Sequence, residues 1–238
     1  MMSDLSQRKK VENNGFLDYV RESSKNTGIY YLNKDIPVWT EQPLSDSVDL
    51  NKVLSKIEKT IPTKYLQYIQ AVRIGMFDEM IERELNALYK DGVLYVSNIQ
   101  DNNQDILDDI IHEISHAVEQ NNSEIVFGDG KIEQEFIGKR KRLYNILKSE
   151  GFNVTIEQFL NPKYDQSFDM YLFQEVGYPL LNSISGGLFL SAYSITSINE
   201  YFAVGFESFY IDKTPYLDKM CPQLSNKLNY LDEMANEY

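Results

Sequence analysis

The sequence predicts an α+β fold: a small mixed or antiparallel sheet and one long helix, followed by a mostly helical C-terminal half. Three observations predict this class. Short runs rich in β-branched and aromatic residues lie within the first hundred residues, an amphipathic segment follows them, and later apolar residues recur at helical spacing. Because no repeat or linker interrupts the chain, we expect one domain over residues 25–238, divided into a mixed subdomain (25–121) and a helical subdomain (122–238).

The N-terminal elements follow from local composition. Residues 1–24 are polar and charged, so we expect an arm that lies outside the core. Three apolar runs predict strands at Gly28–Leu32, Gln70–Met76 and Val93–Ile99. Between the first two, Asp49–Lys59 has the spacing of an amphipathic helix.

The chain has only two histidines, and they stand in the run His112-Glu113-Ile114-Ser115-His116. This HExxH spacing places two imidazoles one helical turn apart on one face, where both can reach a single ion. Asn102 or Asn103 can cap the helix that carries the run. The alternative is that both histidines are ordinary solvated or core residues and that Glu113 is a surface charge.

The helix around this motif is predicted to be amphipathic, because its apolar residues recur at helical period. At about 100° per residue, His112 and His116 lie opposite the apolar stripe, and Glu113 lies on the flank between the two faces. A helix buried on its apolar side would present both imidazoles to a cleft. The stripe consists of Leu107, Ile110, Ile111, Ile114, Ala117 and Val118.

A third metal ligand has to be a carboxylate, because no other histidine exists and Cys221 is the only cysteine. Glu200 is the best candidate, since it lies in an otherwise apolar helical segment that Ser197 or Asn199 can cap. The alternative is that Glu200 forms a buried ion pair with an arginine or lysine. Glu207 is the reserve candidate.

Together these residues resemble a known peptidase family. The HExxH run, the helix Glu200-Tyr201-Phe202-Ala203 and Tyr193, seven residues before Glu200, are similar to the catalytic domain of anthrax lethal factor and the related Pro-Pro endopeptidases. The segment Ala71–Gly75 resembles the strand before their active-site helix. Their C-terminus resembles Cys221-Pro222-Gln223 and the leucine-bearing helix after it. The similarity covers roughly residues 65–235.

The resemblance implies a zincin-like fold in which His112, His116 and Glu200 bind one Zn²⁺. It assigns Glu113 to the general base and Tyr193 to stabilisation of the oxyanion. Members of this family pair an extended substrate with an edge strand beside the active-site helix. Val93–Ser97 is the candidate for that strand, and the alternative is an interior strand without a free edge.

The sequence departs from the family pattern in two places. The family has a further glutamate four residues after the ligand glutamate, where this chain has Val204, so another acidic residue must support the site. Asp108, Asp109 and Glu207 are the candidates. In addition, 83 residues separate His116 from Glu200, which indicates an insertion.

That insertion is placed at about residues 154–190, after a predicted helix at Lys131–Glu150 that stops at Gly151. It contains a predicted helix at Phe168–Val176. Because the insertion precedes Tyr193, it could wall or cover the substrate cleft. The alternative is an elaboration of the packing that makes no contact with substrate.

The predicted function is that of a zinc-dependent metalloendopeptidase, a hydrolase that cleaves an extended polypeptide. The alternative is a non-catalytic structural or partner-binding protein, such as a component of a virus particle, that keeps the fold and the metal. An intracellular toxin or effector would share the peptidase chemistry. Intact Glu113 favours catalysis, because a purely structural site has no use for a base beside the metal.

Charge and composition limit the partners and the compartment. The net charge of −13 disfavours binding to nucleic acid or anionic membranes and favours basic peptides. A single cysteine excludes an intramolecular disulfide and fits a reducing compartment. Neither a signal peptide nor a transmembrane segment is predicted. We therefore expect a cytoplasmic protein, or one delivered by a non-classical route or within a larger assembly.

Overall fold

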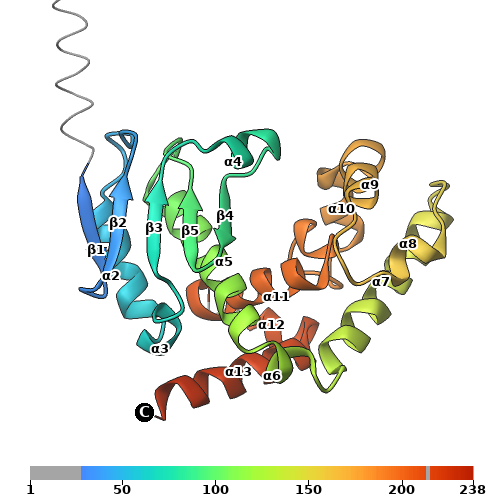
Figure 1. The fold of residues 1–238 in the computed structure, drawn as a ribbon. Coiled ribbons are helices and arrows are strands. Elements are labelled where there is room, and N and C mark those ends of the chain that lie inside the picture. Colours follow the sequence, from blue (N-terminus) through green and yellow to red (C-terminus); the bar gives the residue numbers. More distant parts are fainter. Residues whose placement is uncertain (1–27, 213–214, 238) are drawn as a thin grey trace, which may run out of the picture. The chain divides into compact units, whose positions relative to one another are not determined.

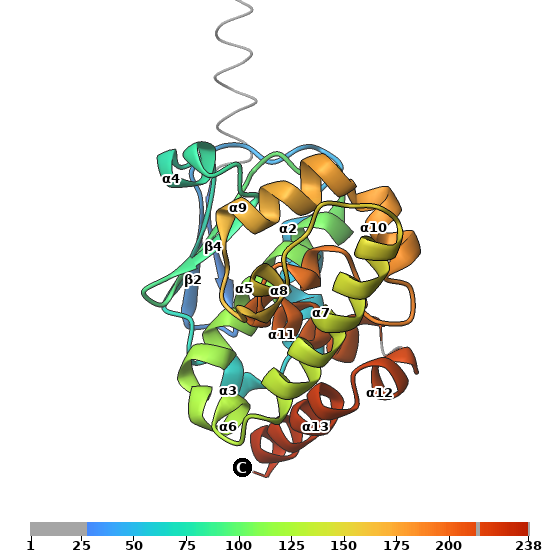
Figure 2. The same ribbon diagram turned by 90° about the vertical axis from the view of Figure 1, so that its right-hand side faces the viewer.

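The computed structural model describes residues 28–212 and 215–237 of the chain (Figures 1 and 2). These residues form two compact units. The first unit runs to Lys59 and resumes over Ile69–Ile110, and the second comprises Thr60–Tyr68 and the chain from Ile111 onwards. The first unit contains a mixed sheet and the second is helical, which confirms the predicted α+β class. The predicted arm at 1–24 lies outside the described residues.

The sheet has five strands in the order β1-β2-β3-β5-β4. Strands β2, β3 and β5 run parallel, and an antiparallel strand flanks them on either side. The three predicted strands are confirmed as β1, β3 and β5, whereas β2 and β4 were not predicted. The bounds are β1 Ile29–Leu32, β2 Ile36–Thr40, β3 Ala71–Ile74, β4 Ala87–Lys90 and β5 Val93–Val96.

One face of the sheet is buried and the other is partly exposed, as alternation along a strand requires. Val38, Val72 and Leu94 lie side by side on neighbouring strands, and each is completely buried. On the opposite face, Arg73 stacks 5.6 Å from the centre of the Tyr95 ring. This difference between the faces fixes the register, because a slip of one residue would expose the apolar set.

The prediction that Val93–Ser97 forms an edge strand is wrong, and the alternative of an interior strand is confirmed. Strand β5 lies between β3 and β4, and β4 is at the edge of the sheet. Asp91 and Gly92 form a two-residue turn with φ values of 51° and 84°, which folds β4 back onto β5. Positive φ at both positions suits the turn that joins twisted antiparallel strands, and Asp-Gly is its preferred sequence. The residues of β4 are all at least partly exposed, so the strand shows no clear alternation.

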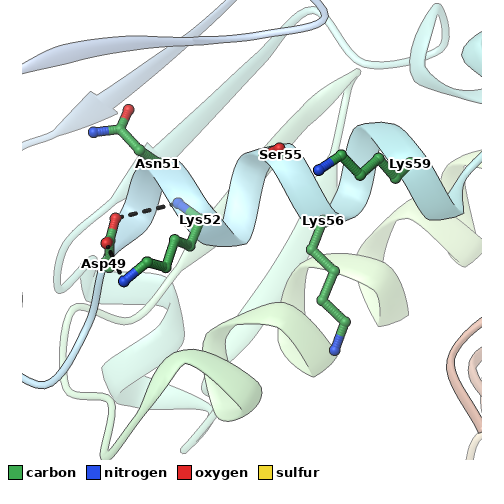
Figure 3. A pocket seen from close by; sticks show the side chains of 6 residues that line it. All are labelled: Asp49, Asn51, Lys52, Ser55, Lys56 and Lys59. Atoms are coloured by element: carbon green, nitrogen blue, oxygen red, sulfur yellow. Dashed lines mark hydrogen bonds and ion pairs between the residues drawn. The ribbon is translucent and has the colours of Figure 1, made fainter.

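Helix α2 (Leu50–Thr60) confirms the predicted amphipathic helix. Its buried side carries Leu50, Val53, Leu54 and Ile57. Its solvent side carries three lysines along an open hollow (Figure 3), where the ammonium of Lys52 lies 2.9 Å from the Asp49 carboxylate. The short helices α3 (Thr63–Leu66) and α4 (Asp78–Glu82) flank β3 along the chain.

The HExxH run lies on α5 (Asn103–Asn121), which confirms the predicted helix. Asn102 is its cap, since its side-chain oxygen accepts hydrogen bonds from the backbone N–H groups of Gln104 (2.7 Å) and Asp105 (3.2 Å). The helix begins in the first unit and continues into the second at Ile111. The whole predicted apolar stripe is buried, with exposed fractions of 2% or less.

In the second unit, α7 (Lys131–Ser149) ends as predicted at Gly151, whose φ is +90°. There the Phe152 N–H donates to the Leu147 carbonyl at 3.0 Å, a bond typical of a glycine-terminated helix. The α-helices that lie after α5 and outside the segment 154–190 also include α6 (Ser123–Phe127), α11 (Ile198–Glu207), α12 (Tyr216–Met220) and α13 (Pro222–Asn236). The π-helix η3 (Ser208–Asp212) directly follows α11. Among the described residues, no helix has the length and apolar character needed to cross a bilayer.

The segment predicted to be an insertion, at about residues 154–190, folds into α8 (Ile156–Leu160), α9 (Gln166–Tyr171), the π-helix η1 (Leu172–Val176) and α10 (Tyr178–Ile184). The predicted helix at Phe168–Val176 is confirmed, although its second half has π geometry. Arg140 of α7 is buried, donates to the Gln158 carbonyl at 2.9 Å and lies 4.2 Å from the Phe168 ring centre. The insertion is thus packed around a buried cation.

Candidate metal centre

Three side chains of the second unit converge at one point. His112 and His116 are one turn apart on α5, with ring centroids separated by 4.9 Å, and Glu200 lies in the first turn of α11. One ligand atom from each residue lies within 4.8 Å of the others. The group is therefore close enough to hold a metal ion, and it contains the three residues that the sequence singled out as ligands.

Each oxygen of the Glu200 carboxylate faces a different imidazole. Oε2 lies 2.9 Å from His112 Nε2, and Oε1 lies 3.7 Å from His116 Nε2. The ion-pair partners of Glu200 in the described part of the chain are thus histidines rather than a lysine or arginine.

Helix α11 holds Glu200 in place from both ends. Ser197 caps the helix, since its hydroxyl accepts a hydrogen bond from the Glu200 N–H at 3.1 Å, which confirms one of the two predicted caps. At Gly205, a Cβ atom would come within 2.3 Å of the Leu224 side chain on α13, so any larger residue would force that side chain to shift. The buried aromatic rings of Tyr201, Phe202 and Phe206 fix the remaining sides.

Glu207 supports the site from a second turn of α11. Its carboxylate binds Nδ1 of His112, an outer contact of the kind that orients a histidine ring. Of the other candidates for that role, Asp108 accepts from Gln104 at 2.6 Å and Asp109 from Gln100 at 2.8 Å. Glu207 is therefore a partner of His112 and does not belong to the convergent group of three.

The bond to Glu207 determines which nitrogen of His112 is available. A carboxylate only accepts, so Nδ1 of a neutral His112 carries the proton and Nε2 presents its lone pair to Glu200. Oε2 of Glu200 is buried, and no donor of the described residues reaches it in hydrogen-bond geometry. Two lone-pair atoms 2.9 Å apart repel, so a neutral His112 needs a cation between Nε2 and Oε2, whereas without one the ring takes up a second proton on Nε2. The donor set of two imidazoles and one carboxylate fits such a cation.

The pKa values of His112 and Glu200 show how strongly the two groups interact. Burial alone would lower the pKa of His112, but its contacts with Glu200 and Glu207 and the charges of both outweigh burial and raise the pKa well above its ordinary value. Burial alone would raise the pKa of Glu200, but its contact with protonated His112 and the charges of both histidines lower it. The centre therefore favours positive charge.

Glu113 is buried beside this group, with an exposed fraction of 6%, which contradicts the alternative of a surface charge. Burial would lower the pKa of His116, but the Glu119 carboxylate and the charges of Glu200 and Glu113 raise it. The negative charge of Glu113 therefore acts within the centre.

Tyr193 lies in the short 3₁₀ turn η2 (Tyr193–Ile195), with its ring centroid 6.1 Å from that of His112. It is 37% exposed. Its pKa is raised, first by burial and then by the charges of Glu200, Asp169 and Glu113, so its hydroxyl stays protonated and can donate a hydrogen bond. The structure thus places Tyr193 next to the imidazole of His112.

The insertion reaches the turn that carries Tyr193. Asn182 of α10 accepts a hydrogen bond from the Ala192 N–H at 2.8 Å, directly before that tyrosine. Asp169 of α9 accepts from the hydroxyls of Tyr164 (2.9 Å) and Tyr178 (3.2 Å). The sequence carries no local signal for these contacts, because they depend on how the segments pack in three dimensions.

Glu119 is a further polar group of the centre that the sequence analysis missed. Its Oε1 accepts a hydrogen bond from Asn199, and its Oε2 lies 3.7 Å from Nδ1 of His116. The available signal was spacing, since residues three apart on a helix lie on one face.

Comparisons with protein-family models, with curated proteins and with solved structures find no match for this chain.

Proposed function

We propose that this protein is a zinc-dependent metalloendopeptidase that hydrolyses peptide bonds of a protein substrate. The observation that carries the proposal is the convergence of His112, His116 and Glu200 around a point next to buried Glu113. A structural zinc site is usually closed by four protein ligands, whereas a catalytic site has three and keeps one position open. Three ligands beside a carboxylate match the catalytic pattern.

The donor set favours zinc among the metals that proteins use. Two imidazoles and one carboxylate form a known catalytic zinc combination, and softer metals would select thiolate ligands. Zinc held by these residues would act as a Lewis acid, lowering the pKa of a water molecule and polarising a carbonyl group. The outer partner Glu207 would keep His112 in the tautomer that binds through Nε2.

The protein's own residues account for the proton transfers. Glu113 takes a proton from the attacking water on its carboxylate and then donates that proton to the nitrogen of the leaving amine. Tyr193 donates the hydrogen of its protonated hydroxyl to the oxygen that becomes negative in the transition state. The partial exposure of Tyr193 leaves room for a substrate to meet that hydroxyl.

A peptide-library digest combined with zinc analysis tests this function. We would compare the wild type with Glu113→Gln and Tyr193→Phe, using Glu133→Gln and Tyr230→Phe as matched controls at exposed positions. We expect one zinc in every protein. Cleavage should fall by roughly 10²–10⁴-fold in Glu113→Gln and stay unchanged in both controls. Equal cleavage by wild type and Glu113→Gln would refute the mechanism, and a wild type that binds no zinc would refute the site.

A further inference from the structure

A further carboxylate lies at the centre, one turn beyond His116. Glu119 is 7% exposed, and its two oxygens have different surroundings. Oε1 accepts a hydrogen bond from the side chain of Asn199. Oε2 is buried without a hydrogen-bond donor among the described residues, and it faces Nδ1 of His116 at 3.7 Å. A buried acceptor that lacks a donor is unfavourable, so we expect this oxygen to accept a hydrogen bond from a nearby donor.

Asn199 links the two helices of the centre at the positions of the ligands. It precedes Glu200 on α11, while Glu119 follows His116 by one turn on α5. The hydrogen bond between Asn199 and Glu119 therefore joins the helix of one ligand to the helix of another. Because both bonded residues lie beside ligands, this bond limits how far Glu200 can move from His116.

The partner that Oε2 lacks is the Nδ1–H group of His116. His116 can bind an ion through Nε2, the atom that faces Glu200, only if its proton resides on Nδ1. A carboxylate next to Nδ1 selects that tautomer. Glu207 makes the corresponding bond to Nδ1 of His112, so each imidazole has its own carboxylate.

We propose that Glu119 is a positioning residue for metal binding. It accepts a hydrogen bond from Nδ1 of His116 and thereby directs Nε2 towards the ion, and Asn199 holds Glu119 in the orientation that makes this bond. The proposal rests on the metal centre of the proposed function and is independent of peptide cleavage. It predicts an effect of Glu119 on zinc affinity and on the tautomer of one particular histidine.

Zinc affinity provides the first test, measured by competition with a chromophoric chelator. We would compare the wild type with Glu119→Gln, Asn199→Ala, the double variant and the exposed control Glu124→Gln. We expect Glu119→Gln to weaken zinc binding by about 10- to 100-fold, as loss of an outer partner usually does. Asn199→Ala should weaken binding less. The double variant should bind like Glu119→Gln, because both residues act through one bond.

Nitrogen NMR of the zinc-loaded protein provides the second test. Only two histidines exist, so a sample labelled with ¹⁵N at histidine shows just two rings. We expect both rings to carry the proton on Nδ1, and we expect Glu119→Gln to change the Nδ1–H signal of His116 much more than that of His112. A role confined to folding would lower the thermal stability of Glu119→Gln and leave its zinc affinity and both ring signals unchanged.

These outcomes separate the two proposals. Tight zinc binding by the wild type together with unchanged affinity in Glu119→Gln and Asn199→Ala would overturn the role of Glu119 and leave the metal centre intact. A wild type that binds no zinc would overturn the centre itself. Asn199→Ala leaves Glu119 in place, so it tests the proposal even if Glu119→Gln does not fold.

Discussion

The two imidazoles of the HExxH run stand one turn apart on one helix, yet the protein holds them differently. His112 is bound at both nitrogens by α11, with Glu207 at Nδ1 and Glu200 Oε2 2.9 Å from Nε2. His116 has carboxylates at 3.7 Å from each nitrogen, beyond hydrogen-bond distance. One imidazole is therefore fixed by the fold, and the other is placed so that an ion, if bound, would complete its contacts.

The difference arises from the spacing of the carboxylates. Glu200 and Glu207 are seven residues apart, so they lie two turns apart on the same face of α11. Both carboxylates can therefore contact the His112 ring, one at each nitrogen. His116 meets Glu200 only, and its second carboxylate comes from its own helix. We infer that His112 keeps its position when an ion binds and that the side chains of His116 and Glu119 move to complete their contacts.

The largest expected effect comes from the ligand that both imidazoles share. We expect Glu200→Ala to weaken zinc binding by well over the roughly 100-fold upper range for outer partners, because it removes a ligand that faces both rings. Metal analysis after dialysis measures the loss, with the exposed Glu157→Ala as control. Retention of zinc by Glu200→Ala would show that Glu200 is not a metal ligand.

Tyr193 lies beside His112, so its loss should affect turnover on that side of the centre and leave the metal in place. We expect Tyr193→Phe to reduce the cleavage rate by about 10²–10³-fold, the usual cost of losing one oxyanion donor, with zinc content unchanged. Steady-state kinetics should show the loss in kcat more than in KM. A variant that cleaves as fast as the wild type would remove Tyr193 from the mechanism.

The two outer carboxylates give the sharpest comparison. We expect Glu207→Gln to weaken zinc binding by about 10- to 100-fold, and by more than Glu119→Gln does, since Glu207 bonds to its histidine before any ion arrives. Chelator competition on both variants measures the difference. A larger loss in Glu119→Gln would reverse the assignment of the fixed and the adjustable ligand.

The smallest effect concerns protonation of the metal-free protein. The pKa of His112 is raised well above its ordinary value and that of His116 is raised too, so we expect His112 to lose its proton at the higher pH. A raised histidine pKa stabilises the fold fully below about pH 6.5, and this stability is lost as the pH rises through the folded value. NMR titration of the two rings and melting curves across that interval test both statements. Deprotonation of His112 at a lower pH than His116 would contradict the expected order of the two rings.

The grouping of His112, His116 and Glu200 could be predicted from the sequence because its signals are local. The spacing of His112 and His116 depends on one helix, and Glu200 was recognised as a charge in an apolar segment whose start Ser197 marks. Helix α7 likewise ended where Gly151 predicted. Each of these features is decided within a few residues of the chain, which is the range over which helix periodicity and capping act.

The missed features depend on contacts between distant segments. Strand β4 shows no alternation because it lies at an edge of the sheet, and its partner is fixed only when the Asp91-Gly92 turn folds it onto β5. The bond between Glu119 and Asn199 joins residues 80 positions apart. Such pairings are decided by tertiary packing, which overrides local preference, so composition and periodicity do not reveal them.

Zinc K-edge X-ray absorption on the wild-type protein is the most direct test of the metal centre. We expect one bound zinc with two imidazole rings at about 2.0–2.1 Å, oxygen at the remaining positions and no sulfur. The single cysteine, Cys221, is buried away from the ligand group, so a Zn–S signal at about 2.3 Å would contradict the assigned ligands. A spectrum with fewer than two imidazoles, or a protein that takes up no zinc, would contradict the centre itself.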